Sequence, residues 1–126
     1  MLRDKTSSAI VAVSDLERAR RFYGETLGLE LKQSAEEEGV LVYRTGATVL
    51  TVYRSDYAGT NRANAVTWDV GADVEAIVAD LRSKGVRFEH YDMDGMTGAD
   101  IHEAGDMRLV WFKDPDGNIL HLIGGA

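Results

Sequence analysis

The chain has no cysteine among its 126 residues. This absence excludes disulfides, a thiol nucleophile and any metal site built from thiolates. Long apolar runs are also missing, so the sequence offers no transmembrane helix and we expect no membrane partner. The N-terminal stretch MLRDKTSSAIVAV lacks an apolar core of signal-peptide length. A cytoplasmic protein is therefore the expectation.

Basic residues are outnumbered: 14 Lys and Arg stand against 21 Asp and Glu, for a net charge of −7. Nucleic-acid binding relies on basic patches that neutralise phosphates, so we expect no nucleic-acid partner. The acidic balance would suit a cationic small molecule. It is equally typical of a surface charged for solubility, and that alternative stays open.

The chain is long enough for one domain with a sizeable core, and we expect a single domain over residues 1–126. Its first half begins with an alternating strand pattern at 8–13, followed by a helical pattern. Ser14 and Glu17 match a capping box that would start this helix. Gly28 is a typical residue to end it in a left-handed conformation.

The second half repeats this order. Residues 65–70 alternate as a strand, Asp73 is the expected helix cap, and Gly85 the expected helix end. Each half then continues with three strand patterns. These patterns lie at 29–34, 39–44 and 47–53 in the first half, and at 86–90, 107–113 and 118–123 in the second.

These patterns predict an α+β fold made of two βαβββ modules, at 7–54 and 64–124. Two such modules can pair into one cupped mixed sheet, with the helices on its outer face and a pocket within. The segment YDMDGMTGADIHEAGD, residues 91–106, shows little periodicity, and loops of this length are often functional. It can close over the pocket mouth, or it is a simple surface excursion.

Two motifs, VSDLERARRFYGETLGLEL and WFKDPDGNILHL, carry a family resemblance. The chain resembles the vicinal oxygen chelate superfamily, which includes glyoxalases, extradiol dioxygenases, and the fosfomycin and bleomycin resistance proteins. The resemblance covers essentially the whole chain. It implies paired βαβββ modules, a cupped sheet and a homodimer.

In the enzymes of that superfamily, four side chains hold a divalent metal. The resemblance places these positions on Ser8, Thr51, Ala65 or its neighbour Asn64, and His121. Only His121 is a good ligand, whereas a catalytic metal site needs about three protein ligands. We therefore expect no cofactor, with a divalent metal disfavoured and His121 its one weak candidate ligand.

Strand alternation predicts which side chains line the pocket. Asp69 is either a counter-charge for a cationic ligand or the partner of an arginine such as Arg108. Trp68 shares the helix side with the core. His121 is either hydrogen-bonded to a neighbour or engaged in ligand contact or acid–base work, which makes it the best catalytic candidate. The predicted ligand-binding residues are Ser8, Ile10, Thr51, Tyr53, Thr67, Asp69, Met96, Trp111 and His121.

A lining of small, apolar and a few polar groups is typical of a small-molecule pocket. The sequence therefore predicts a non-catalytic protein that sequesters a drug or metabolite, with an aromatic or cationic small molecule as its partner, as the resemblance to bleomycin resistance proteins implies. Two alternatives stay open. One is a metal-dependent enzyme of the glyoxalase or dioxygenase type, and the other is a metal-free enzyme that uses His121.

Overall fold

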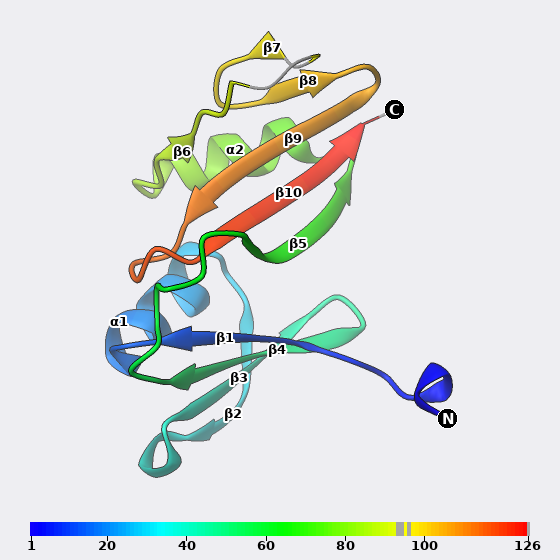
Figure 1. Ribbon diagram of the computed structural model, residues 1–126. Coiled ribbons are helices and arrows are strands. Elements are labelled where there is room, and N and C mark those ends of the chain that lie inside the picture. Colours follow the sequence, from blue (N-terminus) through cyan, green and yellow to red (C-terminus); the bar gives the residue numbers. More distant parts are fainter. Residues whose placement is uncertain (93–94, 96, 126) are drawn as a thin grey trace. The chain divides into compact units, whose positions relative to one another are not determined.

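The computed structural model describes residues 1–92, 95 and 97–125 and forms two compact units. The first unit contains Met1–Asn61 and the short segment Pro115–Asn118. The second contains Arg62–Asp114 and Ile119–Ala126. The predicted α+β class is confirmed, and the first unit has the predicted βαβββ order, as Figure 1 shows. The second unit adds two short strands, β7 (Thr97–Gly98) and β8 (His102–Ala104), to that order.

The first unit is built on a four-stranded sheet, the first sheet, in the order β1-β4-β3-β2. β1 runs parallel to β4, and the other neighbours are antiparallel. Its elements are η1 (Leu2–Asp4), β1 (Ala9–Val13), α1 (Leu16–Arg20), η2 (Arg21–Thr26), β2 (Glu30–Ala35), η3 (Glu36–Glu38), β3 (Val40–Thr45) and β4 (Thr48–Arg54).

One face of the first sheet forms the core of this unit. Val11 and Val13 are buried, whereas Ile10, which precedes Val11, is 62% exposed, as the alternation of a strand requires. Tyr23 of η2 packs near Tyr43 of β3, with ring centroids 6.3 Å apart. The opposite face, which carries Ile10, is called the open face of the first sheet.

The first helix begins differently from the prediction. Asp15 is its N-cap, and the Asp15 carboxylate accepts a hydrogen bond from the Arg18 backbone N–H at 3.0 Å. The expected capping box of Ser14 with Glu17 is therefore wrong. The Ser14 hydroxyl instead donates to Asp116 at 2.5 Å, because the turn that carries Asp116 lies against this end of the helix.

The same helix widens after its first turn. α1 ends at Arg20 and η2 continues it as a π-helix, in which the Leu27 N–H donates to the Phe22 carbonyl five residues back. Gly28 follows with φ +73°, so the predicted left-handed end is confirmed. The apolar spacing predicted an ordinary α-helix over the whole stretch, and η2 corrects that prediction.

The turn Pro115–Asn118 packs with the first unit although the strands on either side of it belong to the second. Asp116 accepts hydrogen bonds from the Ser14 backbone N–H at 3.1 Å and forms an ion pair with Arg18 at 3.1 Å. The Asn118 amide donates to the Ala12 carbonyl at 2.8 Å. The turn residues thus complete the first unit with polar contacts.

The second unit is built on a larger sheet, the second sheet, in the order β5-β10-β9-β8-β7, with β6 also paired to β9. β5 and β10 run parallel, which repeats the pairing of β1 with β4. Its elements are β5 (Asn64–Gly71), α2 (Val74–Ser83), β6 (Phe88–Glu89), β7 (Thr97–Gly98), β8 (His102–Ala104), β9 (Met107–Lys113) and β10 (Ile119–Gly125).

α2 covers one face of the second sheet, behind β9 and β10 in Figure 1. Val74, Val78 and Leu81 are buried along the helix, as their spacing predicts. A Cβ built on Gly124 would meet Val74, which places the even-numbered residues of β10 on the α2 side. The odd-numbered residues of β10, His121 among them, lie on the opposite face, here called the open face of the second sheet.

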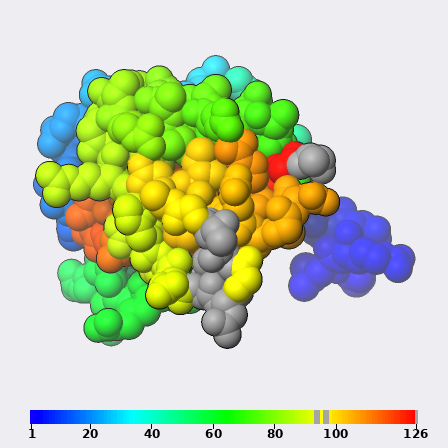
Figure 2. Space-filling view, turned by 90° about the horizontal axis from the view of Figure 1, so that it is seen from above, coloured from blue at the N-terminus to red at the C-terminus, as the bar shows by residue number. Residues whose placement is uncertain are grey.

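The segment 91–106 is more structured than predicted. β8 pairs with β9, and β7 pairs with β8, so the segment extends the second sheet at its edge. Asp100 accepts from Arg82 of α2 at 2.6 Å and pairs with His90 at 2.6 Å. Figure 2 shows residues 97–106, yellow to orange, at the surface beside α2. Met96 lies outside the described residues.

No helix in the described part of the chain is long and apolar enough to cross a membrane.

Candidate functional site

Two rows of side chains cross the open face of the second sheet. The strand register aligns Thr67 of β5 with His121 of β10, His121 with Trp111 of β9, and Trp111 with Glu89 of β6. Directly paired residues point to the same side of a sheet. The adjacent row consists of Asp69, Ile123, Leu109 and His102.

Four rings from these rows and from the following chain form an aromatic cluster: Tyr91, His102, Trp111 and His121. Trp111 is its centre. The His121 ring stacks on Trp111 with centroids 4.7 Å apart and planes 18° apart, whereas Tyr91 and His102 meet Trp111 edge-on at 5.1 and 5.0 Å. Such contacts hold each ring in one orientation. Trp111 is 7% exposed, so its ring is mostly covered by protein.

His121 is held in one tautomer. Its Nδ1 lies 3.0 Å from the Val110 carbonyl oxygen, and because a carbonyl only accepts, Nδ1 carries the proton. Nε2 therefore keeps its lone pair. Burial of the side chain lowers the pKa of His121 below its usual 6.5, and the bond to Val110 opposes this only in part. The imidazole is a neutral hydrogen-bond acceptor.

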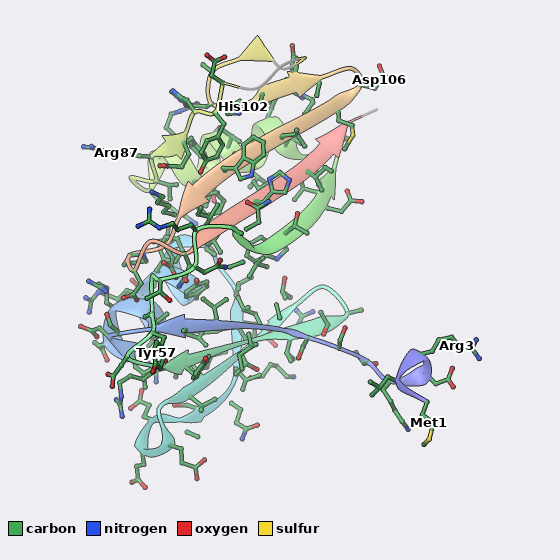
Figure 3. The ribbon with its side chains drawn as sticks, in the orientation of Figure 1. Met1, Arg3, Tyr57, Arg87, His102 and Asp106 are labelled. Carbon is green, nitrogen blue, oxygen red and sulfur yellow. The ribbon has the colours of Figure 1, made fainter. Side chains whose placement is uncertain are left out.

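His102 has the opposite arrangement. Its Nε2 accepts a hydrogen bond from the Tyr91 backbone N–H at 2.9 Å, so the proton of the neutral ring resides on Nδ1. The residue is only 2% exposed, and Nδ1 has no hydrogen-bond partner among the described residues. Figure 3 shows His102 on β8 beside β9. This residue ties the chain after β6 to the aromatic cluster.

A hollow of about 390 Å³ lies beside the aromatic cluster. Its wall combines two aromatic rings, an aliphatic side chain, an amide and one charge of each sign. Such a mixture suits a small organic molecule with a ring and a few polar groups. The hollow is lined by Arg62, Asn64, Tyr91, Asp92, Trp111 and Ile119.

The other residues predicted in the second unit lie near this cluster but outside the hollow's wall. Thr67 and Asp69 are exposed on the open face. The Asp69 carboxylate accepts from the Gly71 backbone N–H at 3.1 Å. Arg108, the partner considered for Asp69, forms an ion pair with Glu75 at 2.7 Å instead. Trp68 pairs with Leu122 on the α2 side, as predicted.

The predicted residues of the first unit share the open face of the first sheet. Ile10 pairs with Thr51, and Ala12 pairs with Tyr53, so the two candidates on β4 stand beside β1. Ser8 precedes β1 and is exposed. Each sheet thus carries its own set of the predicted residues on the face away from its helices.

Sequence reasoning missed part of the site. Tyr91 belongs to the segment expected to be a loop, and His102, Arg62 and Asp92 are not among the predicted ligand-binding residues. Strand alternation identifies Ile119 once His121 is placed, since the two are separated by two positions. His102 depends on the pairing of β8 with β9, for which the local sequence gives no signal.

The residues at the implied metal positions do not fit a divalent ion. An alanine has no donor atom, and neutral serine, threonine and asparagine side chains are poor replacements for imidazole or carboxylate. In the part of the chain that the structure describes, no three His, Asp or Glu side chains gather closely enough to hold a metal. We derive no chemistry through a metal.

A family model described as "Glyoxalase/Bleomycin resistance protein/Dioxygenase superfamily" matches residues 5–122. No curated protein sequence matches the chain.

Solved structures share the fold. One is the fosfomycin resistance protein FosX from Listeria monocytogenes, with 15% identity and a TM-score of 0.77, covering 98% of this chain and 93% of that one. Lactoylglutathione lyase from Agrobacterium tumefaciens has 16% identity and a TM-score of 0.74, with 97% and 94% covered. An integron cassette protein from the Halifax Harbour sewage outfall metagenome has 19% identity and a TM-score of 0.72, with 96% and 98% covered. At these identities the likeness establishes the fold alone.

Proposed function

Because the chain belongs to the glyoxalase/bleomycin resistance protein/dioxygenase superfamily, we propose that it binds a small planar aromatic molecule without transforming it. The site of this proposal is the hollow beside the aromatic cluster. The observation that carries it is the pairing of that hollow with Trp111 and Tyr91, whose rings are fixed in place before any ligand arrives. A fixed site loses little conformational entropy on binding.

The chemistry around the cluster supports binding over catalysis. His121 is flanked on β10 by Ile119 and Ile123, and its neighbours across the sheet are Thr67 and Trp111. Within the described residues, no nucleophile is hydrogen-bonded to the His121 ring, as nucleophilic catalysis would require. Sequestration of a drug or metabolite needs only shape, apolar contact and a few polar groups.

Thermal shift measurements with planar aromatic compounds test this proposal. A ligand that binds only the folded state stabilises it by about 2.7 kcal/mol at a concentration of 100 Kd, which raises Tm by several degrees. Trp111→Leu and Tyr91→Leu should each reduce the shift. Tyr57→Leu is the matched control, because Tyr57 is 79% exposed and belongs to the first unit. If no compound in a broad library of aromatic molecules raises Tm, the proposal is contradicted.

The proposed binding of an aromatic molecule requires no metal ion. Elemental analysis of purified protein should find no stoichiometric zinc, nickel, iron or manganese. About one such ion per chain, lost in His121→Ala, would overturn this part of the proposal.

A metal-free enzyme is the second candidate, and the tautomer of His121 favours it. A neutral imidazole with Nδ1 bonded to a carbonyl and Nε2 free is also the arrangement of a general base. The two candidate functions differ in whether the ligand is turned over. A ligand that is recovered unchanged after long incubation supports binding alone. Homodimerisation and a cytoplasmic location stay predictions from the sequence.

A further inference from the structure

His121 presents one acceptor atom on the open face of the second sheet. The two nitrogens of an imidazole point in diverging directions, so when Nδ1 donates to the β9 backbone, Nε2 points away from that strand. Four buried polar side-chain atoms lack a partner in the described structure: Arg18 Nε, Tyr43 Oη, His102 Nδ1 and Arg108 Nε. His121 Nε2 is not one of them, and no hydrogen bond to it from a described residue accompanies the Val110 contact. The atom is thus still open to a donor from outside.

This acceptor is fixed in position. The Val110 bond and the stack on Trp111 hold the ring on two sides, and the residue as a whole is only 9% exposed. Ile119, two positions along β10, lines the hollow, and so does Trp111, which pairs directly with His121. A ligand in the hollow therefore contacts the two residues that flank the imidazole.

The residues beside His121 on the open face decide what it costs to leave Nε2 unpaired. Ile119 and Ile123 are aliphatic, and Trp111 covers one face of the ring. A bound aromatic molecule would displace water from this surface. A polar atom that loses water without gaining a partner is destabilising, so a ligand that brings a donor binds more tightly than one that does not.

We propose that His121 makes the site selective for planar aromatic molecules that carry a hydrogen-bond donor, either a phenolic O–H or a ring N–H. The inference rests on the proposed function, since it assigns a ligand class to the same site. His121 acts here as a specificity-determining residue, and no bond is made or broken.

Matched probe pairs test the proposal: indole against N-methylindole, and naphthol against its methyl ether. Each pair keeps the ring and replaces the donor hydrogen with a methyl group. Calorimetric titration of the full chain should show about tenfold tighter binding of the donor member, the usual effect of one hydrogen bond. In His121→Phe the ratio should fall to about one, because phenylalanine keeps a ring against Trp111 but has no acceptor.

His90→Phe is the matched control, since it makes the same chemical change at an exposed histidine that pairs with Asp100. Its tenfold ratio should persist. A ratio that also persists in His121→Phe would overturn the assignment of the acceptor to His121. Should His121→Phe fail to fold, NMR of the ring nitrogens in the unaltered protein decides instead. Naphthol, but not its methyl ether, should shift the Nε2 resonance, and an unmoved resonance would overturn the proposal.

Failure of this inference is distinguishable from failure of the proposed function. If both members of each pair bind equally well, the site still binds aromatic molecules, and only the proposed selectivity is overturned. Absence of binding by all four probes to the unaltered protein overturns the selectivity, and a negative thermal-shift library then contradicts the proposed function as well.

Discussion

Asp15 precedes α1 and supplies the only side-chain cap recorded at the start of either α-helix of the described chain. The hydrogen bond from the Arg18 N–H lowers the pKa of the Asp15 carboxyl, because the bond favours the charged form. Asp15→Ala should therefore lower Tm by a few degrees through loss of this cap.

Glu17→Gln separates this cap from the capping box that the sequence suggested. Glu17 is exposed, and its recorded ion pair is a 3.9 Å contact with Arg21. Surface pairs of this kind contribute little, so the variant should melt close to the unaltered protein. Equal losses in Asp15→Ala and Glu17→Gln, measured by circular dichroism, would contradict the assignment of the cap to Asp15.

His121 gives the protein a pH dependence of known sign. Burial lowers the pKa of this histidine in the folded state below the usual 6.5 that it has in the unfolded chain. Below about pH 6.5 the unfolded state thus binds more protons, and the free energy of unfolding falls as the pH falls. Above that pH both states are neutral at this position and the contribution is constant.

Urea unfolding between pH 5 and 8 checks this prediction. His121→Phe removes the titrating group, so its stability should decline less between about pH 6.5 and 5 than that of the unaltered protein. The contact of His90 with Asp100 is present in both proteins and cancels in the comparison. Parallel pH profiles for the two proteins would show that His121 titrates alike in the folded and unfolded states.

At the scale of the secondary structure elements, local pattern sufficed where one face of a strand or helix is buried. The six strands that follow the two helices were predicted, and β9 (Met107–Lys113) matches its predicted bounds. The hairpin strands of the first unit begin and end one residue later than predicted. Alternation gives this accuracy because burial selects every second residue.

A local irregularity of the first helix and two short edge strands were missed. The apolar residues around η2 recur at the spacing of an ordinary α-helix, so sequence periodicity could not reveal the π-helical turn. β7 and β8 are two and three residues long, and β8 is a strand only because β9 offers it a free edge. The candidate site shows the same division. Alternation assigned His121 to one face of its strand, whereas Trp111, with apolar neighbours on both sides, was placed only by its pairing with His121, and His102 only by the β8–β9 register.

Gly124 illustrates a constraint that belongs to an element rather than to a residue. Its backbone has no left-handed φ, yet a Cβ there would overlap the Gly71 carbonyl oxygen and the Val74 side chain. Both obstacles are fixed, one by the backbone at the end of β5 and the other by the buried start of α2. Gly124→Ala should therefore destabilise the protein by roughly 2–3 kcal/mol through overpacking.

Gly85→Ala is the matched control for this prediction. Gly85 ends α2 with φ +90° and has open space around it, so alanine there costs only backbone strain, about 1 kcal/mol. Denaturant unfolding should rank Gly124→Ala as the more harmful substitution. The reverse order would mean that β5 and α2 separate easily enough to admit a methyl group.

At the scale of the whole molecule, the compact units are not two contiguous stretches of chain. The predicted modules, 7–54 and 64–124, assign the turn at 115–118 to the second, whereas its contacts are with the first unit. Turn chemistry alone accounts for Pro115 and Gly117, so no local sequence signal indicates that this turn has distant partners. Asp116 contacts Ser14 only after folding, because the two residues are 102 positions apart in the chain.

A fragment of residues 1–61 tests whether the first unit depends on this turn. The fragment keeps the first sheet and its helix but loses Asp116, the partner of Ser14 and Arg18, and Asn118, the donor to Ala12. Chains of about 60 residues have little stability to spare. We therefore expect no cooperative thermal transition by circular dichroism, whereas the full chain carrying Asp116→Ala should still melt cooperatively at a lower Tm. A fragment that melts cooperatively near the Tm of the full chain would show that the core around Tyr23 and Tyr43 is sufficient and that the turn contacts add little.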